Sequence, residues 1–172
     1  MQASKALVEY LLQRGHREIC CVTHMHSQID VIVDREDGFR SALLEQGYIA
    51  EEEKDFLRTD FWAEQYSWDQ SVARIQAYIL RHPEKTAYMA VEHGIAEMVQ
   101  AAIARCSVDR QPQIVSFDSL QGSIYENVYT HIEQDENEMG RQAVDVLAQL
   151  IEGSRQPQTV YVPYRLVAFK KW

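Results

Sequence analysis

The sequence predicts an α/β fold, a Rossmann-like parallel sheet with helices on both faces. Three observations predict it. Short β-prone apolar runs without polar alternation recur along the chain, segments of helical period separate them, and the connections are short. Apolar runs of this kind are typical of strands buried on both faces, and their alternation with helices is typical of a parallel sheet.

The first two elements are a helix and a buried strand. Apolar residues recur at helical spacing over residues 4–14, and Gly15 ends the pattern. They predict a helix of about three turns. The run over residues 18–23 is short, apolar and without alternation. It predicts a strand that is buried on both faces.

A polar loop over residues 24–33 and a second helix are expected next. Asp34 is a residue type that caps helices, the turn after it is acidic, and Gly47 supplies a stop. The predicted helix therefore runs from Asp34 to residue 46. Arg35 is then expected at the junction of loop and helix, where a guanidinium offers a rigid fork of donors to a ligand.

The same pattern continues to the C-terminus, with a break near residue 118. We expect a weaker strand over 54–58, a helix over 67–82 that Pro83 ends, a strand over 86–91, a turn over 92–94, a helix over 95–105 and a strand over 112–118. After it we expect a polar loop over 119–127, a short strand over 128–133, an amphipathic helix over 136–152, a linker over 153–158 and a final strand over 160–169, broken by Pro163.

The composition indicates a soluble globular chain that forms one domain, or one domain and a fragment of another. Its 172 residues are 46% hydrophobic, and 26 acidic against 17 basic residues give a net charge of −9. Binding to a phosphate backbone needs clustered positive charge, so we expect another part of the protein to contact DNA, if any does. No apolar run approaches the roughly 20 residues that span a bilayer, and the first residues lack the apolar core of a secretory signal.

The three cysteines predict reduced thiols in a cytosolic protein. Cys20 and Cys21 are adjacent within an expected strand, so their side chains point to opposite faces and cannot easily form a disulfide. With Cys106 they are expected to pack as small hydrophobic residues, without a redox or metal role.

Polar or aromatic residues follow the expected strands at their carboxyl ends, where open parallel sheets bind ligands. These residues are Arg35, Phe61 or Trp62, Glu92 and Asp118. Each has an ordinary explanation by itself: a solvated charge, a core aromatic ring or a turn cap. Together they predict a pocket with a guanidinium fork, two carboxylates and an aromatic platform. Such a pocket suits a sugar or a nucleoside.

The order of residues also carries a family resemblance over nearly the whole chain. The motifs are Ala3-x-x-Ala6-Leu7-x-x-x-Leu11, Gly15-His16-Arg17-x-Ile19, Arg35-x-x-Gly38-Phe39-x-x-Ala42-Leu43, Ile114-Val115-Ser116-Phe117-Asp118, Thr130-His131-Ile132-x-Gln134-Asp135-x-x-x-Met139-Gly140-x-x-Ala143 and Val162-Pro163-x-x-Leu166-Val167. In combination they resemble the effector-binding core of LacI/GalR-family transcription regulators, whose fold is that of type I periplasmic sugar-binding proteins.

The resemblance implies that this chain holds half of a ligand cleft. Regulators of this family begin with a helix-turn-helix and a first sugar-binding subdomain, and this chain starts at the second. We therefore expect a truncated module. Residues 1–122 would form the C-terminal effector-binding subdomain, 123–154 the crossover strand and helix of the N-terminal subdomain, and 155–172 a return segment with the terminal strand.

Site roles follow from the resemblance by position. It makes Arg35 the residue that binds effector hydroxyls and Asp118 the carboxylate that accepts from them, with Phe61 or the adjacent Trp62 as the stacking ring. Glu92 stands where the family usually has Asn or Asp.

The longer carboxylate at position 92 intrudes on the pocket, which leaves the identity of the ligand open. Gln134 would complete the ligand-binding set, near the crossover between the subdomains.

The resemblance further implies a bacterial regulator that senses a small effector: a sugar, sugar phosphate or nucleoside. Effector binding would control DNA binding by a helix-turn-helix outside this chain. We expect a cytoplasmic homodimer, formed in this half through the helix over 95–105 and the loop that contains Tyr125. No cofactor, metal ion, membrane contact or enzymatic activity is expected.

Two alternatives remain from the residues themselves. One is a periplasmic-type sugar-binding protein of the same fold. The other is a Rossmann-like enzyme, with Glu92 and His93 as an acid/base pair or His24-x-His26 as metal ligands. Adjacent side chains diverge, and no third ligand follows the two histidines closely in sequence. The chain also lacks the glycine-rich nucleotide-binding and nucleophile-elbow motifs.

Overall fold

A computed structural model of the chain describes residues 1–25, 29–59, 67–106, 111–118, 129–153 and 158–169. Within them, six strands form one sheet in the order β2-β1-β3-β4-β5-β6. The strands are β1 (Ile19–His24), β2 (Phe56–Thr59), β3 (Ala87–Ala90), β4 (Gln113–Phe117), β5 (Thr130–Gln134) and β6 (Tyr164–Val167). The first five pair in parallel, and β6 pairs antiparallel with β5.

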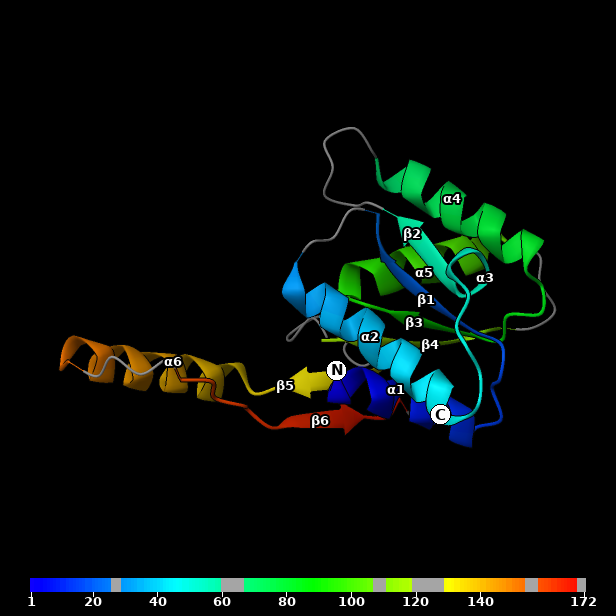
Figure 1. Ribbon diagram of the computed structural model, residues 1–172. Coiled ribbons are helices and arrows are strands. Elements are labelled where there is room, and N and C mark those ends of the chain that lie inside the picture. The colour runs from blue at the N-terminus through cyan, green and yellow to red at the C-terminus, as the bar shows by residue number, and fades with distance from the viewer. Residues whose placement is uncertain (26–28, 60–66, 107–110, 119–128, 154–157, 170–172) are drawn as a thin grey trace.

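Helices cover both faces of this sheet, as the sequence predicted (Figure 1). They are α1 (Gln2–Gln13), α2 (Asp30–Glu45), α3 (Glu52–Asp55), α4 (Trp68–Arg81), α5 (His93–Arg105) and α6 (Glu136–Ile151). Helices α1 and α2 pack together on one face, and α4 and α5 pack together on the other. Strands β1 and β3 are buried along their whole length between these layers. This arrangement confirms the predicted fold class.

The start of α2 corrects the sequence prediction. The helix begins at Asp30, after Ile29 as its N-cap in extended conformation, so residues 30–33 are helical rather than loop. Asp30 places a carboxylate in the first turn, where it stabilises the helix dipole, and Ile32 is buried against the core. Asp34 is therefore not a cap. Arg35 lies in the second turn of the helix instead of at its mouth.

Smaller boundary shifts occur elsewhere. Helix α4 begins as predicted, because Ser67 and Gln70 form a reciprocal capping box. Helix α5 begins at His93 with Glu92 as its N-cap, so the expected turn over 92–94 is the first turn of a helix. Asp55 belongs to α3 and not to the strand expected over 54–58.

The buried cysteines support the expectation of small packed thiols. Cys20 and Cys21 are fully buried, and Cys106 is partly buried, with all three free. Burial raises the pKa of Cys20 to about 12. A thiol in that state is protonated at neutral pH, and thus a poor nucleophile or metal ligand.

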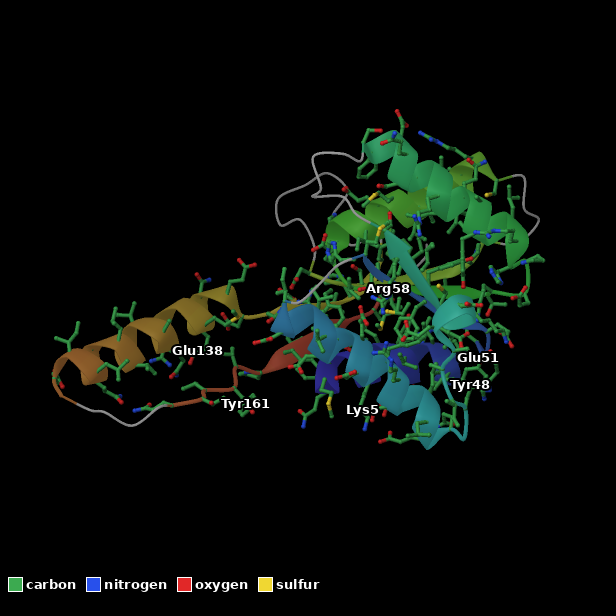
Figure 2. The ribbon with its side chains drawn as sticks, turned by 45° about the horizontal axis from the view of Figure 1, so that its top comes forward. Lys5, Tyr48, Glu51, Arg58, Glu138 and Tyr161 are labelled. Atoms are coloured by element: carbon green, nitrogen blue, oxygen red, sulfur yellow. The ribbon has the colours of Figure 1, made fainter. Side chains whose placement is uncertain are left out.

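Helix α6 and the segment over residues 158–163 form an arm that extends away from the sheet (Figure 1). None of the residues of α6 is buried. Figure 2 shows Glu138 and Tyr161 on this arm, far from the layered body that contains Arg58. Strand β5 itself pairs with β4 in the sheet. The arm therefore starts beyond Gln134.

Among the described residues, no helix combines the length and the apolar character needed to cross a bilayer.

Candidate ligand-binding site

Arg35 is held at the carboxyl edge of the sheet by three contacts. Its Nη1 donates to the carbonyl oxygen of Val91 at 2.5 Å, and its Nη2 lies 3.7 Å from Oδ2 of Asp118. The guanidinium also stacks over the ring of Phe117, 4.0 Å from its centre. Burial lowers the pKa of Arg35, while the charges of Asp118 and Glu92 act against that shift. The group remains a cation, because a guanidinium does not lose its proton in proteins.

Asp118 lies where the chain leaves β4, with a left-handed backbone (φ 60°). Aspartate tolerates this conformation better than most residues, and such positions cluster at functional sites. Its N–H donates to the carbonyl of Ile132 at 2.9 Å, and its Oδ1 accepts from Nε2 of Gln134 at 3.2 Å. The structure thus brings together Arg35, Asp118 and Gln134, which are far apart in sequence.

Glu92 approaches the same edge from the N-cap position of α5. Its Oε2 lies 3.3 Å from Nε2 of His24, the last residue of β1. From sequence, His24 was predicted only as a candidate metal ligand, and its pairing with Glu92 was not predicted. No sequence signal indicated it, because the two residues meet through the β1–β3 pairing and are 68 positions apart.

The buried carboxylate of Glu36, next to Arg35 in the sequence, fixes α2 on the sheet. Glu36 is buried and accepts from Oγ1 of Thr23 at 2.8 Å. It also accepts two hydrogen bonds from Arg58, at 3.0 and 3.1 Å. Such fork-to-fork pairs are strong and directional. Because Glu36 follows Arg35 directly, they hold the turn of α2 that presents the arginine.

Other predicted site residues do not join the group formed by Arg35, Asp118, Gln134 and Glu92. Phe61, Trp62 and His26 lie outside the described residues. His93 points to Glu97, with Nε2 and Oε1 3.5 Å apart. Among the residues that the structure describes, no group of three His, Cys, Asp or Glu side chains could hold a metal ion.

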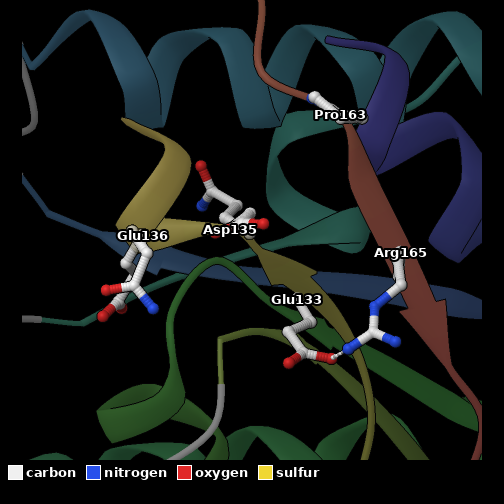
Figure 3. Close-up of a pocket in the computed structure, with 7 residues that line it drawn as sticks. Glu133, Asp135, Glu136, Pro163 and Arg165 are labelled. Carbon is white, nitrogen blue, oxygen red and sulfur yellow. Dashed lines mark hydrogen bonds and ion pairs between the residues drawn. The ribbon is translucent and has the colours of Figure 1, made fainter. Parts of the chain in front are cut away.

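A hollow of about 590 Å³ lies beside the group formed by Arg35, Asp118 and Gln134, at the start of the arm (Figure 3). It is bounded by residues 133–137, Pro163 and Arg165, and Arg165 donates to its cross-strand neighbour Glu133 at 2.7 Å. Gln134 lines this hollow and also donates to Asp118. Arg35, Glu92 and Asp118 do not line it. The hollow therefore adjoins the candidate site through Gln134.

The arrangement suits recognition of a hydroxylated molecule. A guanidinium donates, two carboxylates accept, and an amide does both, all from one edge of a rigid sheet. Vicinal hydroxyls need this mixture, because each hydroxyl both donates and accepts.

Comparison with known proteins supports this reading of the fold. A family model described as a periplasmic binding protein-like domain matches residues 8–168. No curated protein matches the chain.

Many solved structures share the fold, and three illustrate it. A transcriptional regulator CelR in complex with cellobiose is 24% identical, with a TM-score of 0.77, and the match covers 97% of this chain and 49% of that one. A ribose operon repressor from Burkholderia thailandensis, described as putative, is 23% identical with a TM-score of 0.76, covering 96% and 59%. The lac repressor dimer bound to operator and the anti-inducer ONPF is 23% identical with a TM-score of 0.75, covering 96% and 48%. This chain thus spans about half the length of the proteins it resembles.

Proposed function

Because this chain belongs to the family of periplasmic binding protein-like domains, we propose that it is the ligand-sensing part of a bacterial transcription regulator of the LacI/GalR type. In this proposal, a small hydroxylated effector binds at the carboxyl edge of the sheet, and DNA is bound by a helix-turn-helix outside these residues. The observation that carries the proposal is the cluster of Arg35, Asp118 and Gln134, with Glu92 at the same edge.

The related structures support a sugar-like effector and a role at DNA. One of them holds cellobiose, one is named as a ribose operon repressor, and one is bound to its operator. The net charge of −9 fits a chain that leaves the DNA contact to another domain. Such a regulator works in the cytoplasm, where DNA is.

Regulation in this proposal follows from cleft closure. An effector that contacts both halves of the cleft binds the closed form more tightly, and so shifts the population towards it. The shift can change DNA binding only by the difference in effector affinity between the two forms.

A homodimer is part of the same proposal, with α5 as one contact surface. The exposed residues of α5 are Gln100, Ala104 and Arg105. Sedimentation of the protein at increasing concentration tests the dimer.

We propose binding rather than catalysis at this edge. Glu92 contacts His24, and His93 contacts Glu97, so Glu92 and His93 face different partners. A shared acid/base pair would require the two side chains to meet one reacting group.

A thermal-shift screen with sugars, sugar phosphates and nucleosides tests the effector site. A ligand at about 100 times its Kd stabilises the folded state by about 2.7 kcal/mol. Arg35→Ala and Asp118→Ala each remove a charged hydrogen-bonding partner, which costs about 1.5–3 kcal/mol and weakens binding roughly 10-fold to 100-fold.

Arg141→Ala is the matched control, since Arg141 lies on the exposed arm. It should leave ligand binding unchanged. A ligand that stabilises the wild type and all three variants equally would exclude the site.

A further inference from the structure

The amino edge of the sheet carries a second hollow, at the opposite ends of the strands from the candidate ligand-binding site. It has a volume of about 660 Å³ and lies where the chain enters β1, β3 and β4. Residues 14–16 after α1, the end of α4 with the turn after it, and residues 111–112 form its walls. Segments that are distant in sequence thus meet around one cavity of a size that suits a small molecule.

One wall of the hollow is a fixed polar surface. The two ring nitrogens of His16 each have a partner at 3.0 Å, Nδ1 in Oγ1 of Thr86 and Nε2 in Oε1 of Gln113. The amide of Gln113 also reaches the hydroxyl of Tyr10. These side chains hold the starts of β3 and β4 together, so the wall is already formed without a ligand.

Two of the basic side chains in the wall have acidic partners. Nζ of Lys85 lies 2.6 Å from Oδ1 of Asp55, and the Lys85 side chain is fully buried. Nδ1 of His82 lies 3.1 Å from Oε1 of Glu84. Neither group therefore offers an uncompensated charge to a ligand.

Arg14 is the exception. Its guanidinium carbon lies 3.6 Å from the centre of the Tyr10 ring, and it has no carboxylate partner among the residues that the structure describes. The carbonyls of Leu11 and Leu12 at the end of α1 do not occupy it, since they accept from backbone N–H groups of residues 14–16. The ring orients the guanidinium by stacking on one face and leaves its edge of donors available.

The remaining walls are apolar or uncharged. Ile79, Pro83 and Pro112 line the hollow, and the amide of Gln111 beside them makes no hydrogen bond to a described residue. No carboxylate belongs to the described lining of the hollow. An apolar cavity with one uncompensated guanidinium and one free amide matches a ligand that has an apolar body and a single negative charge.

We propose that this hollow is a second ligand-binding site, for a small organic monocarboxylate with an apolar body. The carboxylate accepts from the fork of Arg14 and from the amide of Gln111, and the body packs against Ile79, Pro83 and Pro112. A phosphate suits the site less, because it carries a charge of about −1.5 to −2 against one free cation. The site goes beyond the proposed function, since the effector would bind at the other edge of the sheet.

Isothermal titration of the 172-residue chain at neutral pH tests the site with four probes: 3-phenylpropionate, its uncharged amide, acetate and phenyl phosphate. We expect 3-phenylpropionate to bind at least about tenfold tighter than its amide, which cannot form charged hydrogen bonds with Arg14. Acetate lacks the apolar body, and phenyl phosphate carries more charge than the site compensates. Both should bind at least about tenfold more weakly than 3-phenylpropionate.

Arg14→Gln removes the charge and should bring the affinities for the acid and its amide within about twofold of each other. Gln111→Glu places a carboxylate beside Arg14 and should weaken the binding of 3-phenylpropionate at least about tenfold. Arg74→Gln, on the exposed side of α4, changes the net charge as Arg14→Gln does and should leave the ranking of the probes unchanged. Thermal unfolding without ligand confirms that the variants are folded.

Each failure has its own meaning. Equal binding of the acid and its amide, or no binding of 3-phenylpropionate, overturns the site. A preference for the acid that persists in Arg14→Gln overturns its location, and tightest binding of phenyl phosphate overturns the ligand class. The effector site is tested separately by the screen of sugars, sugar phosphates and nucleosides, so the proposed function stands or fails independently.

Discussion

At the residue scale, the most deeply buried charged pair among the described residues lies away from the candidate ligand-binding site. Nζ of Lys85 is 2.6 Å from Oδ1 of Asp55, and the two side chains are 0% and 1% exposed. Asp55 also accepts from the N–H of Glu51 and the hydroxyl of Tyr48, each at 2.8 Å. Burial opposes ionisation of Asp55, but these hydrogen bonds and the charge of Lys85 outweigh it and lower its pKa. The Asp55 carboxylate is thus ionised at neutral pH.

Lys85→Met should destabilise the protein by about 3–5 kcal/mol, because it leaves the Asp55 carboxylate buried without its cation. Urea unfolding measures the loss. Lys5→Met is the matched control, since the pair of Lys5 with Glu45 is at the surface and worth less than about 1 kcal/mol.

The double variant Lys85→Met with Asp55→Asn should recover part of the stability, since no buried charge then remains unpaired. A loss from Lys85→Met no larger than that from Lys5→Met would contradict this account of the buried pair.

At the element scale, α1 and α2 approach closely at Gly38. A Cβ added there would lie 2.6 Å from Cβ of Ser4 and would also overlap the carbonyl oxygen of Met1. The two helices must therefore separate before any larger residue fits. In the motif Arg35-x-x-Gly38-Phe39, this contact lies one turn after Arg35.

Gly38→Ala should destabilise the protein by about 1–3 kcal/mol, the usual cost of overpacking. Gly140→Ala is the control, because Gly140 is also helical and nothing lies within 4 Å of its added Cβ. That change should be neutral or stabilising by up to about 1 kcal/mol, from helix propensity alone. Chemical unfolding of both variants gives the comparison, and equal effects would contradict close packing at Gly38.

Elements buried on both faces could be predicted from sequence, because their residues are mostly apolar. Strands β1, β3 and β4 are of this kind. The start of α2 could not be predicted, because Asp34 fits the cap position well by residue type. In the structure the helix begins at Asp30, and Ile32 in its first turn is buried. The proximity of Arg35 and Asp118 at the carboxyl edge of the sheet was predicted from their positions after strands.

Contacts between side chains from different elements carried no sequence signal. The stacking of Arg35 on Phe117 is such a contact, since Phe117 looks like any buried strand residue. The pairing of His24 with Glu92 is another. Both depend on strand order, which brings β1, β3 and β4 side by side.

At the scale of the whole molecule, a well-packed layered body contrasts with the exposed arm of α6. Five large apolar side chains of α6 are exposed: Met139, Val144, Leu147, Leu150 and Ile151. The helix has a strong apolar face but no buried residue. Helix α5, of similar length, buries six residues in the body. Stability should therefore differ sharply between these two helices.

Hydrogen exchange followed by mass spectrometry tests that difference in the 172-residue chain. Amides of α6 should exchange at least about tenfold faster than those of α5, because opening α6 exposes little apolar surface that was buried, whereas opening α5 disrupts the core. Strands β1 and β3 should be the slowest. Equal protection of α5 and α6 at all protein concentrations would contradict an independent arm. Protection of α6 that rises with concentration would instead show that a second copy covers its apolar face.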